Sequence, residues 1–528
     1  MTQQFTDSYD VVVTGAGMAG IVVAAKIAAG GVNPRTGGRL RIALIERGPY
    51  LKGAPRPGYG HPVRRRMFTN ITTEFREGGR YVMGVPQGPG GRTSLPIPAA
   101  SIVGGGSLHY GAETRDPHSV DYLAWQAETG VDWSEANMKG AAQEIVRMFN
   151  IHERPRQLLD EFSLGFGQAG RDLGYEVSPT PVAKQNCLLS GFCDSINMCK
   201  YDARGGSFVA YLPIAEKNGV DIIPEAEVQR VILEKGRATG VEFIQEGTTK
   251  VLRAEKVVVS CGIFGSPVLL MRSGYGSRDE LGRDLLVENS NVGRNIDTRP
   301  GPGTSHIGVF DAAMSDGEFH DGGFHLFHDT QPNRQFERIQ FRNSPPLVGQ
   351  PHQVALHDVA PEFGRKHKNF MSQICNPAVP SAHRDEVLKR GRMTIAVVRP
   401  AGVFGRTNIK AELSYQVNHP RIQKVLEEGN QIAEKVLRAM NAKEVIRNDR
   451  PISSRRFFAW AGSCRAGTDS GTSVVNQYGE SHDVENLLVC DASIMPRCAS
   501  QGYGAPTATV AAFISERIVA RHFTKSEA

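Results

Sequence analysis

Three glycines near the start of the chain have the spacing that suits phosphate binding. Gly15, Gly17 and Gly20 form the motif GAGMAG, between the β-branched run YDVVVT and the apolar run IVVAAKIAA. Glycines let the start of a helix approach a pyrophosphate, and an acid that ends the next strand binds a ribose. Glu46 directly follows the next strand-like run, residues 41–45. This order of parts predicts a dinucleotide site and leaves both NAD and FAD open as its ligand.

Two later segments have chemistry that suits the same ligand. Gly104, Gly105 and Gly106, in SIVGGGSLHYG, can direct backbone N–H groups at an anion. Asp491 ends the strand-like run LLVCD and can hold sugar hydroxyls or the phosphate side of a dinucleotide. The last apolar helix is expected to start near Pro506, since proline suits a first helical turn. The dipole at that helix start favours a negatively charged ligand.

The order of these motifs resembles the glucose–methanol–choline (GMC) family of flavoprotein oxidoreductases. The family shares a GG-x-S loop, an A/C-G-x-x-x-S-P-x-L-L strand–turn and a closing strand with D-A-S. Here these read GGGS, CGIFGSPVLL and DAS, in the family's order. The resemblance selects FAD and implies an oxidase or dehydrogenase that transfers a hydride from a hydroxyl-bearing carbon to flavin N5. The loop Asn186–Lys200, followed by YDARGGSFVAYLP, is similar to the branch of pyranose oxidases, gluconate dehydrogenases and C-glycoside oxidases.

The resemblance implies a wider set of FAD-binding residues than the motifs alone. His109 occupies a position at which some members bind the flavin covalently and others do not, and both states stay open. Val228 matches a strand residue whose backbone contacts adenine. The full implied set is Gly15, Gly17, Met18, Ala19, Gly20, Glu46, Arg47, Gly105, Gly106, Ser107, His109, Val228, Asp491, Ala492, Pro506 and Thr507.

The sequence departs from the family where the catalytic pair belongs. The family places a histidine three residues before the glycine that here is Gly462, and Ala459 stands in its place. The partner, Asn or His, precedes the Pro-Thr that opens the last helix, and Ala505 stands there. A general base of this kind contributes about 10²–10⁴-fold to the rate, and alanine cannot move a proton. Arg465 takes the place of the family's R-M-G arginine, which we interpret as structural.

Tyr503 and Gln501 are the candidates for the missing catalytic groups. Both lie in SQGYGAP, on the loop that faces the flavin in this family. A tyrosine can donate or accept a proton if its pKa is lowered, and a glutamine can bind a carbonyl or hydroxyl group. Trp460 is a candidate platform for a ring-shaped substrate. His109 and His357 stay open as displaced bases.

Three functions are compatible with an FAD scaffold that lacks the usual pair. The first is an oxidoreductase that acts on a hydroxyl group of a sugar, a glycoside or another bulky hydroxylated substrate. The second is a non-redox or light-driven flavoprotein, similar to the lyases and decarboxylases of the family. The third is an inactive relative that retains FAD.

The elements expected around these residues form an α/β protein with the two-domain GMC fold. A Rossmann-like FAD-binding domain would carry a second, substrate-binding domain of β-sheet plus helices. We expect a helix from His419 onward, where HPRIQKVLEEGNQIAEKVLRAM is amphipathic. The FAD-binding domain is predicted over residues 1–150, 205–298 and 453–528, and the substrate-binding domain and cap over 151–204 and 299–452.

Composition narrows the class of protein further. The 528 residues carry 61 Lys and Arg against 55 Asp and Glu, and the small net charge of +6 does not favour a nucleic-acid partner. No apolar run approaches the ~18 residues of a membrane span, and the first residues lack a secretory pattern. Eight scattered cysteines predict free thiols, no metal site and a cytoplasmic location. The expected partners are a small-molecule substrate and an electron acceptor that is O₂ or unknown.

Overall fold

The computed structural model describes most of the chain, and its longer gaps fall within residues 52–118, 189–200 and 301–456. The described residues are 8–51, 82–87, 91–96, 100–108, 110, 112, 114–117, 119–159, 161–188, 199, 201–300, 305–309, 324–329, 338–344, 373–378, 388–397, 407–415, 420–448, 457–499 and 504–525.

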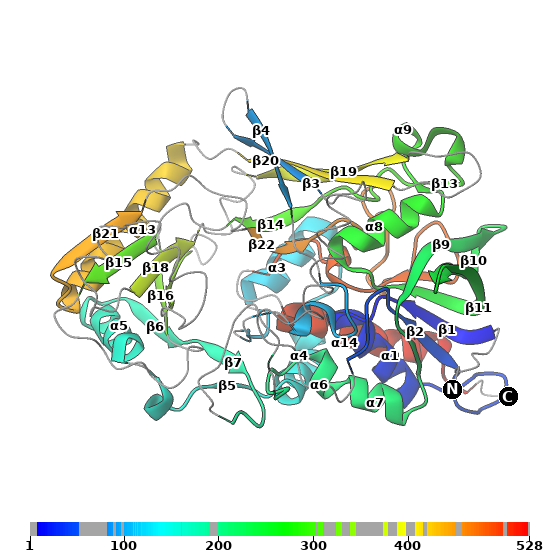
Figure 1. The fold of residues 1–528 in the computed structure, drawn as a ribbon, viewed down its shortest axis with the longest axis horizontal. Helices are drawn as coiled ribbons and strands as arrows, with labels where there is room; N and C mark the ends of the chain where they lie inside the picture. The colour runs from blue at the N-terminus through cyan, green and yellow to red at the C-terminus, as the bar shows by residue number, and fades with distance from the viewer. Residues whose placement is uncertain are drawn as a thin grey trace.

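The first large sheet has seven strands and lies on the right of Figure 1. Its order is β8-β2-β1-β11-β10-β9, and β23 also pairs with β11. The strands β8, β2, β1, β11 and β23 run parallel, whereas β9, β10 and the first half of β11 form an antiparallel extension. The bounds are β1 Ser8–Thr14, β2 Ile42–Ile45, β8 Asp221–Ile223, β9 Ala226–Glu234, β10 Arg237–Gln245, β11 Thr248–Val259 and β23 Leu487–Val489.

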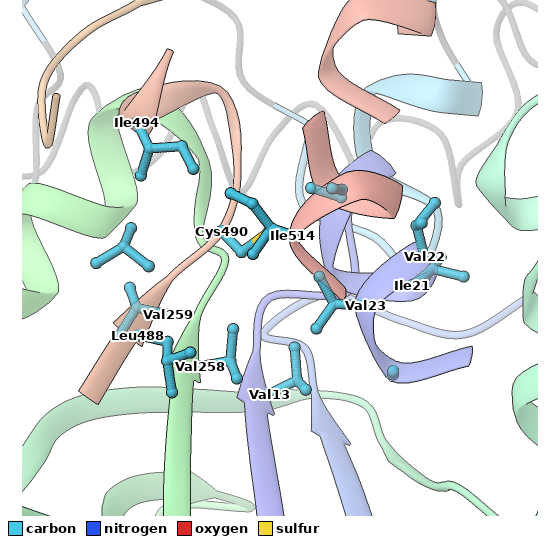
Figure 2. Close-up of a cluster of buried hydrophobic side chains, with 14 of the residues drawn as sticks. Val13, Ile21, Val22, Val23, Val258, Val259, Leu488, Cys490, Ile494 and Ile514 are labelled. Carbon is cyan, nitrogen blue, oxygen red and sulfur yellow. The ribbon is translucent and has the colours of Figure 1, made fainter. Parts of the chain in front are cut away.

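Two helices from opposite ends of the chain pack together against this sheet (Figure 1). They are α1, Met18–Gly30, and α14, Gly504–His522. Figure 2 shows Val23 of α1 and Ile514 of α14 gathered with Val13 and Val258 of the sheet, and all four side chains are buried. Apart from Lys26, which pairs with Glu144 and Glu516, α1 consists of apolar residues and glycines, most of them buried, so it is a core helix rather than a surface helix.

A second layer of strands lies away from the first sheet, on the left of Figure 1. This six-stranded sheet is antiparallel, with the order β21-β15-β18-β17-β16-β6. Helices α5, Glu161–Asp172, and α13, Pro420–Ala439, share a separate hydrophobic cluster that includes Phe166 and Leu437. The strands are β6 Glu176–Pro179, β15 Ser305–Val309, β16 Phe324–Asp329, β17 Arg338–Ser344, β18 Gln373–Ala378 and β21 Glu444–Asn448.

Smaller sheets lie at the top of Figure 1 and between the two large ones. Strands β19, Leu388–Val397, β20, Thr407–Tyr415, β3, Val82–Gln87, and β4, Gly91–Pro96, form one sheet in that order. A pair of strands, β14 and β22, brings residues 297–300 beside residues 457–461. The remaining main elements are α3 Ser119–Thr129, α4 Glu135–Met148, β5 Ile151–Glu153, β7 Pro181–Ala183, α6 Ser207–Ala210, α7 Leu212–Lys217, α8 Gly262–Arg272, β12 Tyr275–Gly276, α9 Arg278–Leu281, β13 Val287–Glu288, β14 Asp297–Pro300 and β22 Phe457–Ala461.

The predicted elements around the first glycine motif are present in the structure. The expected strands are β1 and β2, the expected helix is α1, and the amphipathic helix from His419 is α13. The last helix starts at Gly504, two residues before the predicted start. The residue limits predicted for the two domains stay a prediction.

Two kinds of feature are absent from the described part of the chain. In that part of the chain, no helix is both long and apolar enough to cross a bilayer. Nor do three or more His, Cys, Asp or Glu side chains of the described ranges gather where they could hold a metal ion.

Candidate functional site

The three glycines of the first motif have different local surroundings. A Cβ atom on Gly15 would lie 2.4 Å from the carbonyl oxygen of Ser260, and one on Gly20 would lie 1.9 Å from that of Gly15. A Cβ atom on Gly17 would meet nothing within 4 Å. Gly15 and Gly20 are therefore required by close backbone packing, whereas Gly17 borders open space at the N-cap of α1. That open space fits a ligand that approaches the start of the helix.

Glu46 is buried beside this turn at the carboxyl end of β2. Its carboxylate accepts hydrogen bonds from the N–H groups of Ala16 at 3.0 Å and Gly48 at 2.9 Å. Burial raises the pKa of this carboxyl group, while these N–H groups and the charge of Arg47 oppose the rise. The carboxylate is thus fixed next to the glycine turn, where the dinucleotide prediction requires an acid.

The start of β9 lies next to Glu46. The N–H of Ala226 donates to the carbonyl of Glu46 at 2.9 Å. Val228 follows two residues later, pairs with Phe243 of β10 and is only partly buried. The residues predicted to contact the ribose and the adenine therefore lie on neighbouring strand ends.

The second glycine cluster packs directly on the first. The N–H of Gly104 donates to the carbonyl of Ala16 at 2.8 Å, and a Cβ atom on Gly105 would lie 2.8 Å from the Cα of Gly17. Residues Gly105–Leu108 form a short 3-10 turn, closed by a 2.6 Å hydrogen bond from the Ser107 hydroxyl to the carbonyl of Gly104. A Cβ atom on Gly106 would meet nothing within 4 Å. Gly106 therefore borders open space, as Gly17 does.

Asp491 joins the ends of β23 and β11. One carboxylate oxygen accepts from the N–H of Gly262 at 2.8 Å and from the hydroxyl of Ser266 at 2.5 Å, and the other accepts from the N–H of Ser493 at 2.7 Å. Burial raises the pKa of this carboxyl group, and these donors lower it. The donors hold the carboxylate, with the buried neighbour Ala492, against the turn at Gly262. Direct contact of Asp491 with FAD stays a prediction.

Helices α1 and α14 run parallel, so their starts lie side by side. A Cβ atom on Gly504 would lie 3.1 Å from the terminal methyl of Met18, and at the other end one on Gly30 would lie 3.8 Å from Val519. Both helices therefore direct the positive ends of their dipoles toward the glycine turns, an arrangement that fits an anionic group. The predicted residues Ala19, Pro506 and Thr507 lie in these first turns and are buried.

Ala505 is fixed at the start of α14 by a distant residue. Its N–H donates a 3.0 Å hydrogen bond to the hydroxyl of Thr114, and both residues are buried. This N–H is one of the helix-start donors that the helix itself leaves without a partner. The position predicted to correspond to one member of the catalytic pair is thus held in place by a contact that no sequence pattern indicated.

The other substituted position lies in β22. This strand pairs with β14, with Ala461 opposite Asp297, and a register shift places Ala459 between the residues opposite Thr298 and Arg299. After the strand, a Cβ atom on Gly462 would lie 2.2 Å from the carbonyl of Asn295. The close approach explains the glycine there and fixes where the strand ends.

Trp460 and Arg465 are held by protein contacts. Trp460 is 6% exposed, and its ring centroid lies 5.4 Å from that of Phe264. Trp460, the residue expected to stack on a ring-shaped substrate, is thus buried in the core of this structure. Arg465 pairs with Glu128 at 3.1 Å and donates to the carbonyl of Thr472 at 2.8 Å, which agrees with the structural interpretation of this arginine.

Asp297 connects the two substituted segments. It belongs to β14, beside β22, and its carboxylate accepts from the N–H of Cys498 at 2.8 Å. Glu128 of α3 adds a second connection, since it pairs with both Arg465 and Arg497. The segments that lead to Ala459 and to Ala505 are therefore fastened to common supports.

Several predicted residues lie outside the described residues. His109, His357, Gln501 and Tyr503 are among them, and for Ala459 the structure describes the strand but not the side chain. Their roles stay predictions.

Comparison with known proteins identifies the family of the chain. Residues 9–300 match the N-terminal part of the GMC oxidoreductase family and residues 390–513 match its C-terminal part. The alcohol dehydrogenase [acceptor] of Pseudomonas putida is 24% identical, over 97% of this chain and 96% of that protein. Pyranose dehydrogenase 2 of Leucoagaricus meleagris is 26% identical, over 59% of this chain and 54% of that protein.

A solved structure supports the fold. The crystal structure of pyridoxine 4-oxidase from Mesorbium loti superimposes with a TM-score of 0.65 and 18% identity, and the match covers 97% of this chain and 100% of that one. These matches confirm the predicted family, the α/β fold class and FAD as the cofactor. The chain therefore belongs to the GMC oxidoreductase family and is an FAD-dependent oxidoreductase.

Proposed function

We propose that this protein oxidises a hydroxyl group of a sugar, a glycoside or another bulky hydroxylated small molecule. One observation carries the proposal. The turns that would hold FAD are intact around Gly17, Gly106 and Glu46, whereas the resemblance to the family aligns alanines with both positions of its catalytic pair. Alanine is smaller than an imidazole or an amide side chain, and the proposal is that a bulky substrate uses this difference in volume beside the buried Ala505.

The residues that would hold FAD divide into two groups. The starts of α1 and α14, with the turn at Gly106, suit the phosphates and the flavin, while Glu46 and the start of β9 suit the adenosine. When bound, FAD supplies a hydride acceptor, and the electrons then pass to O₂ or to another acceptor.

The chain itself must bind the substrate, orient its C–H bond and remove the hydroxyl proton. We assign the proton step to Tyr503, with Gln501 as a hydrogen-bond partner of the substrate oxygen. A hydroxyl that is already acidic, such as a phenol or an enol, needs less help from a base, which also favours such substrates at a site without histidine.

The proposal includes a cytoplasmic location and no nucleic-acid partner. It is supported by the small net charge of +6 and by six cysteines of the described ranges that are free thiols. Free thiols are typical of a reducing compartment.

The same two alanines support a second candidate. A non-redox or light-driven flavoprotein would also retain the FAD-binding turns and dispense with the acid–base pair. The two candidates differ in whether substrate reduces the flavin.

A turnover assay on a substrate panel tests the proposed class. Purified protein is assayed with sugars, glycosides, phenols and small primary alcohols, with O₂ and with an artificial dye as acceptors. We expect activity with a bulky substrate, which Ala459→His lowers because the imidazole fills the space, while Ala459→Ser, the small control, retains it. Activity confined to small primary alcohols, or a gain in Ala459→His, contradicts the proposal.

A further inference from the structure

Arg204 is a buried cation that the FAD assignments have not used. The residue is 6% exposed. Its guanidinium donates one hydrogen bond, from Nη1 to the carbonyl of Leu108 at 3.3 Å. Among the residues that the structure describes, no carboxylate forms an ion pair with Arg204. An arginine stays charged in proteins, and a buried charge without a counter-charge is costly.

Tyr110, an acidic group close enough to feel the charge of Arg204, does not supply that counter-charge. Its hydroxyl donates to the carbonyl of Gly205. Burial raises the pKa of this hydroxyl well above its usual range, although the charge of Arg204 opposes the rise. Tyr110 is therefore neutral, and within the described ranges Arg204 has no ion-pair partner, which leaves its positive charge for a bound group.

The surroundings of Arg204 place it at the glycine turns. Leu108 ends the 3-10 turn that packs on Gly17. A Cβ atom on Gly206 would lie 3.0 Å from the Cβ of Ser107 in the same turn, and the ring of Tyr110 lies 3.1 Å from the Cβ position of Gly504 at the start of α14. The segment with Arg204 thus contacts the second glycine cluster and, through Tyr110, the start of the last helix.

The contacts also indicate which end of FAD this segment faces. Glu46 bonds to Ala16, directly before Gly17, and marks the adenosine end. Arg204 is connected to Gly17 by a different set of contacts: Gly105 packs on Gly17, and Leu108 of the same turn accepts a hydrogen bond from Arg204. The pyrophosphate turn therefore separates Glu46 from Arg204.

We propose that Arg204 presents a buried positive charge to the flavin end of bound FAD and stabilises the reduced, anionic cofactor. A hydride carries two electrons and one proton, so the neutral oxidised ring becomes an anion unless another proton follows. A histidine at position 459 could supply a compensating positive charge, but alanine cannot. Arginine does not act as a base at neutral pH, so this role is separate from removal of the substrate proton. The inference rests on FAD binding and not on the proposed substrate class.

The midpoint potential of the bound flavin tests this role without any substrate. Arg204→Gln removes the charge and retains an amide donor for Leu108, Arg204→Lys retains the charge, and Arg237→Gln removes an exposed charge as a control. Each FAD-loaded protein is titrated with a reductant against a reference dye. We expect the ratio of reduced to oxidised flavin at fixed potential to fall at least tenfold in Arg204→Gln, equivalent to about 30 mV for two electrons. Arg204→Lys and Arg237→Gln should stay close to the wild type.

FAD content and thermal unfolding separate this role from a structural one. An unchanged potential in FAD-loaded Arg204→Gln overturns the proposal, even if its melting temperature falls. An unfolded Arg204→Gln, beside a folded wild-type apoprotein, assigns the residue to folding and also overturns it. If KM for the substrate changes while the midpoint potential does not, Arg204 acts in substrate binding and the proposal is wrong.

Discussion

The backbone N–H of Ala505 donates a 3.0 Å hydrogen bond to the hydroxyl of Thr114, across a separation of 391 residues. Thr114 itself donates its N–H to the carbonyl of Pro181. The first turn of α14, which faces the glycine turns, is therefore anchored to the segment that follows the second glycine cluster.

Thr114→Val should destabilise the protein, because it leaves the N–H of Ala505 buried without an acceptor. An unsatisfied buried donor costs about 1–3 kcal/mol. The melting temperature of the FAD-loaded protein should fall in Thr114→Val and should change less in Thr114→Ser, which retains the hydroxyl. Equal stability of the two variants would show that the hydrogen bond does not anchor the helix.

Two glycine substitutions should distinguish a glycine that FAD binding requires from a glycine that backbone packing requires. Gly17→Ala directs a methyl group into open space, so we expect a folded protein with weakened FAD binding. Gly20→Ala places its Cβ 1.9 Å from the carbonyl oxygen of Gly15, so we expect a lowered melting temperature even for the apoprotein. Circular dichroism of the apoproteins and FAD titration measure the two effects. Full FAD affinity in folded Gly17→Ala would place the cofactor elsewhere.

Tyr503→Phe tests the residue assigned to the proton step. The hydroxyl group is lost and the ring is kept, so turnover should fall by about 10²-fold or more while FAD binding stays unchanged. The pH profile of kcat should also lose the limb on which activity rises with pH, because Tyr503 must be deprotonated to accept the substrate proton. Full activity in Tyr503→Phe removes this residue from the mechanism and favours a base from another part of the chain.

Glu480 should make the attachment of the C-terminal helix sensitive to acid. Hydrogen bonds from His522, Asn476 and Arg521 hold the pKa of Glu480 at about 2, although burial opposes them. Because this value lies below that of an unfolded chain, about 4.3, the contribution to stability is complete above the unfolded pKa and is lost as the pH falls toward the folded one.

The matching experiment compares melting temperatures of the wild type and Glu480→Gln as a function of pH. The wild type should be the more stable protein near neutral pH, and the difference should shrink between about pH 4.5 and about pH 2. A difference that stays constant across this range would show that ionised Glu480 does not hold α14.

Local chemistry explains which parts of the site could be predicted from the sequence. The turn from Gly15 to Gly20 and the acid Glu46 lie in one strand–helix–strand unit, so spacing alone identifies them. Thr114 and Asp297 could not be found in this way, because their partners lie 391 and 201 residues away. No local pattern marks a buried hydroxyl or carboxylate whose partner is a distant backbone N–H.

Two other residues show where sequence patterns are insufficient. Trp460 lies in FFAWA, where every residue is apolar, so alternation cannot tell which face of β22 is buried. Arg204 follows a loop that contains three cysteines. Only its contact with Leu108 reveals that its charge lies beside the glycine turns.

Anaerobic reduction of the bound flavin by substrate tests the central claim most directly. The yellow holoenzyme is mixed without O₂ with the bulky hydroxylated compound that supports turnover, and the flavin absorption is followed. The account predicts that the flavin band bleaches at a rate no slower than turnover, with one oxidised product formed for each flavin reduced. Product formation while the band stays unbleached would contradict hydride transfer and would identify a non-redox flavoprotein.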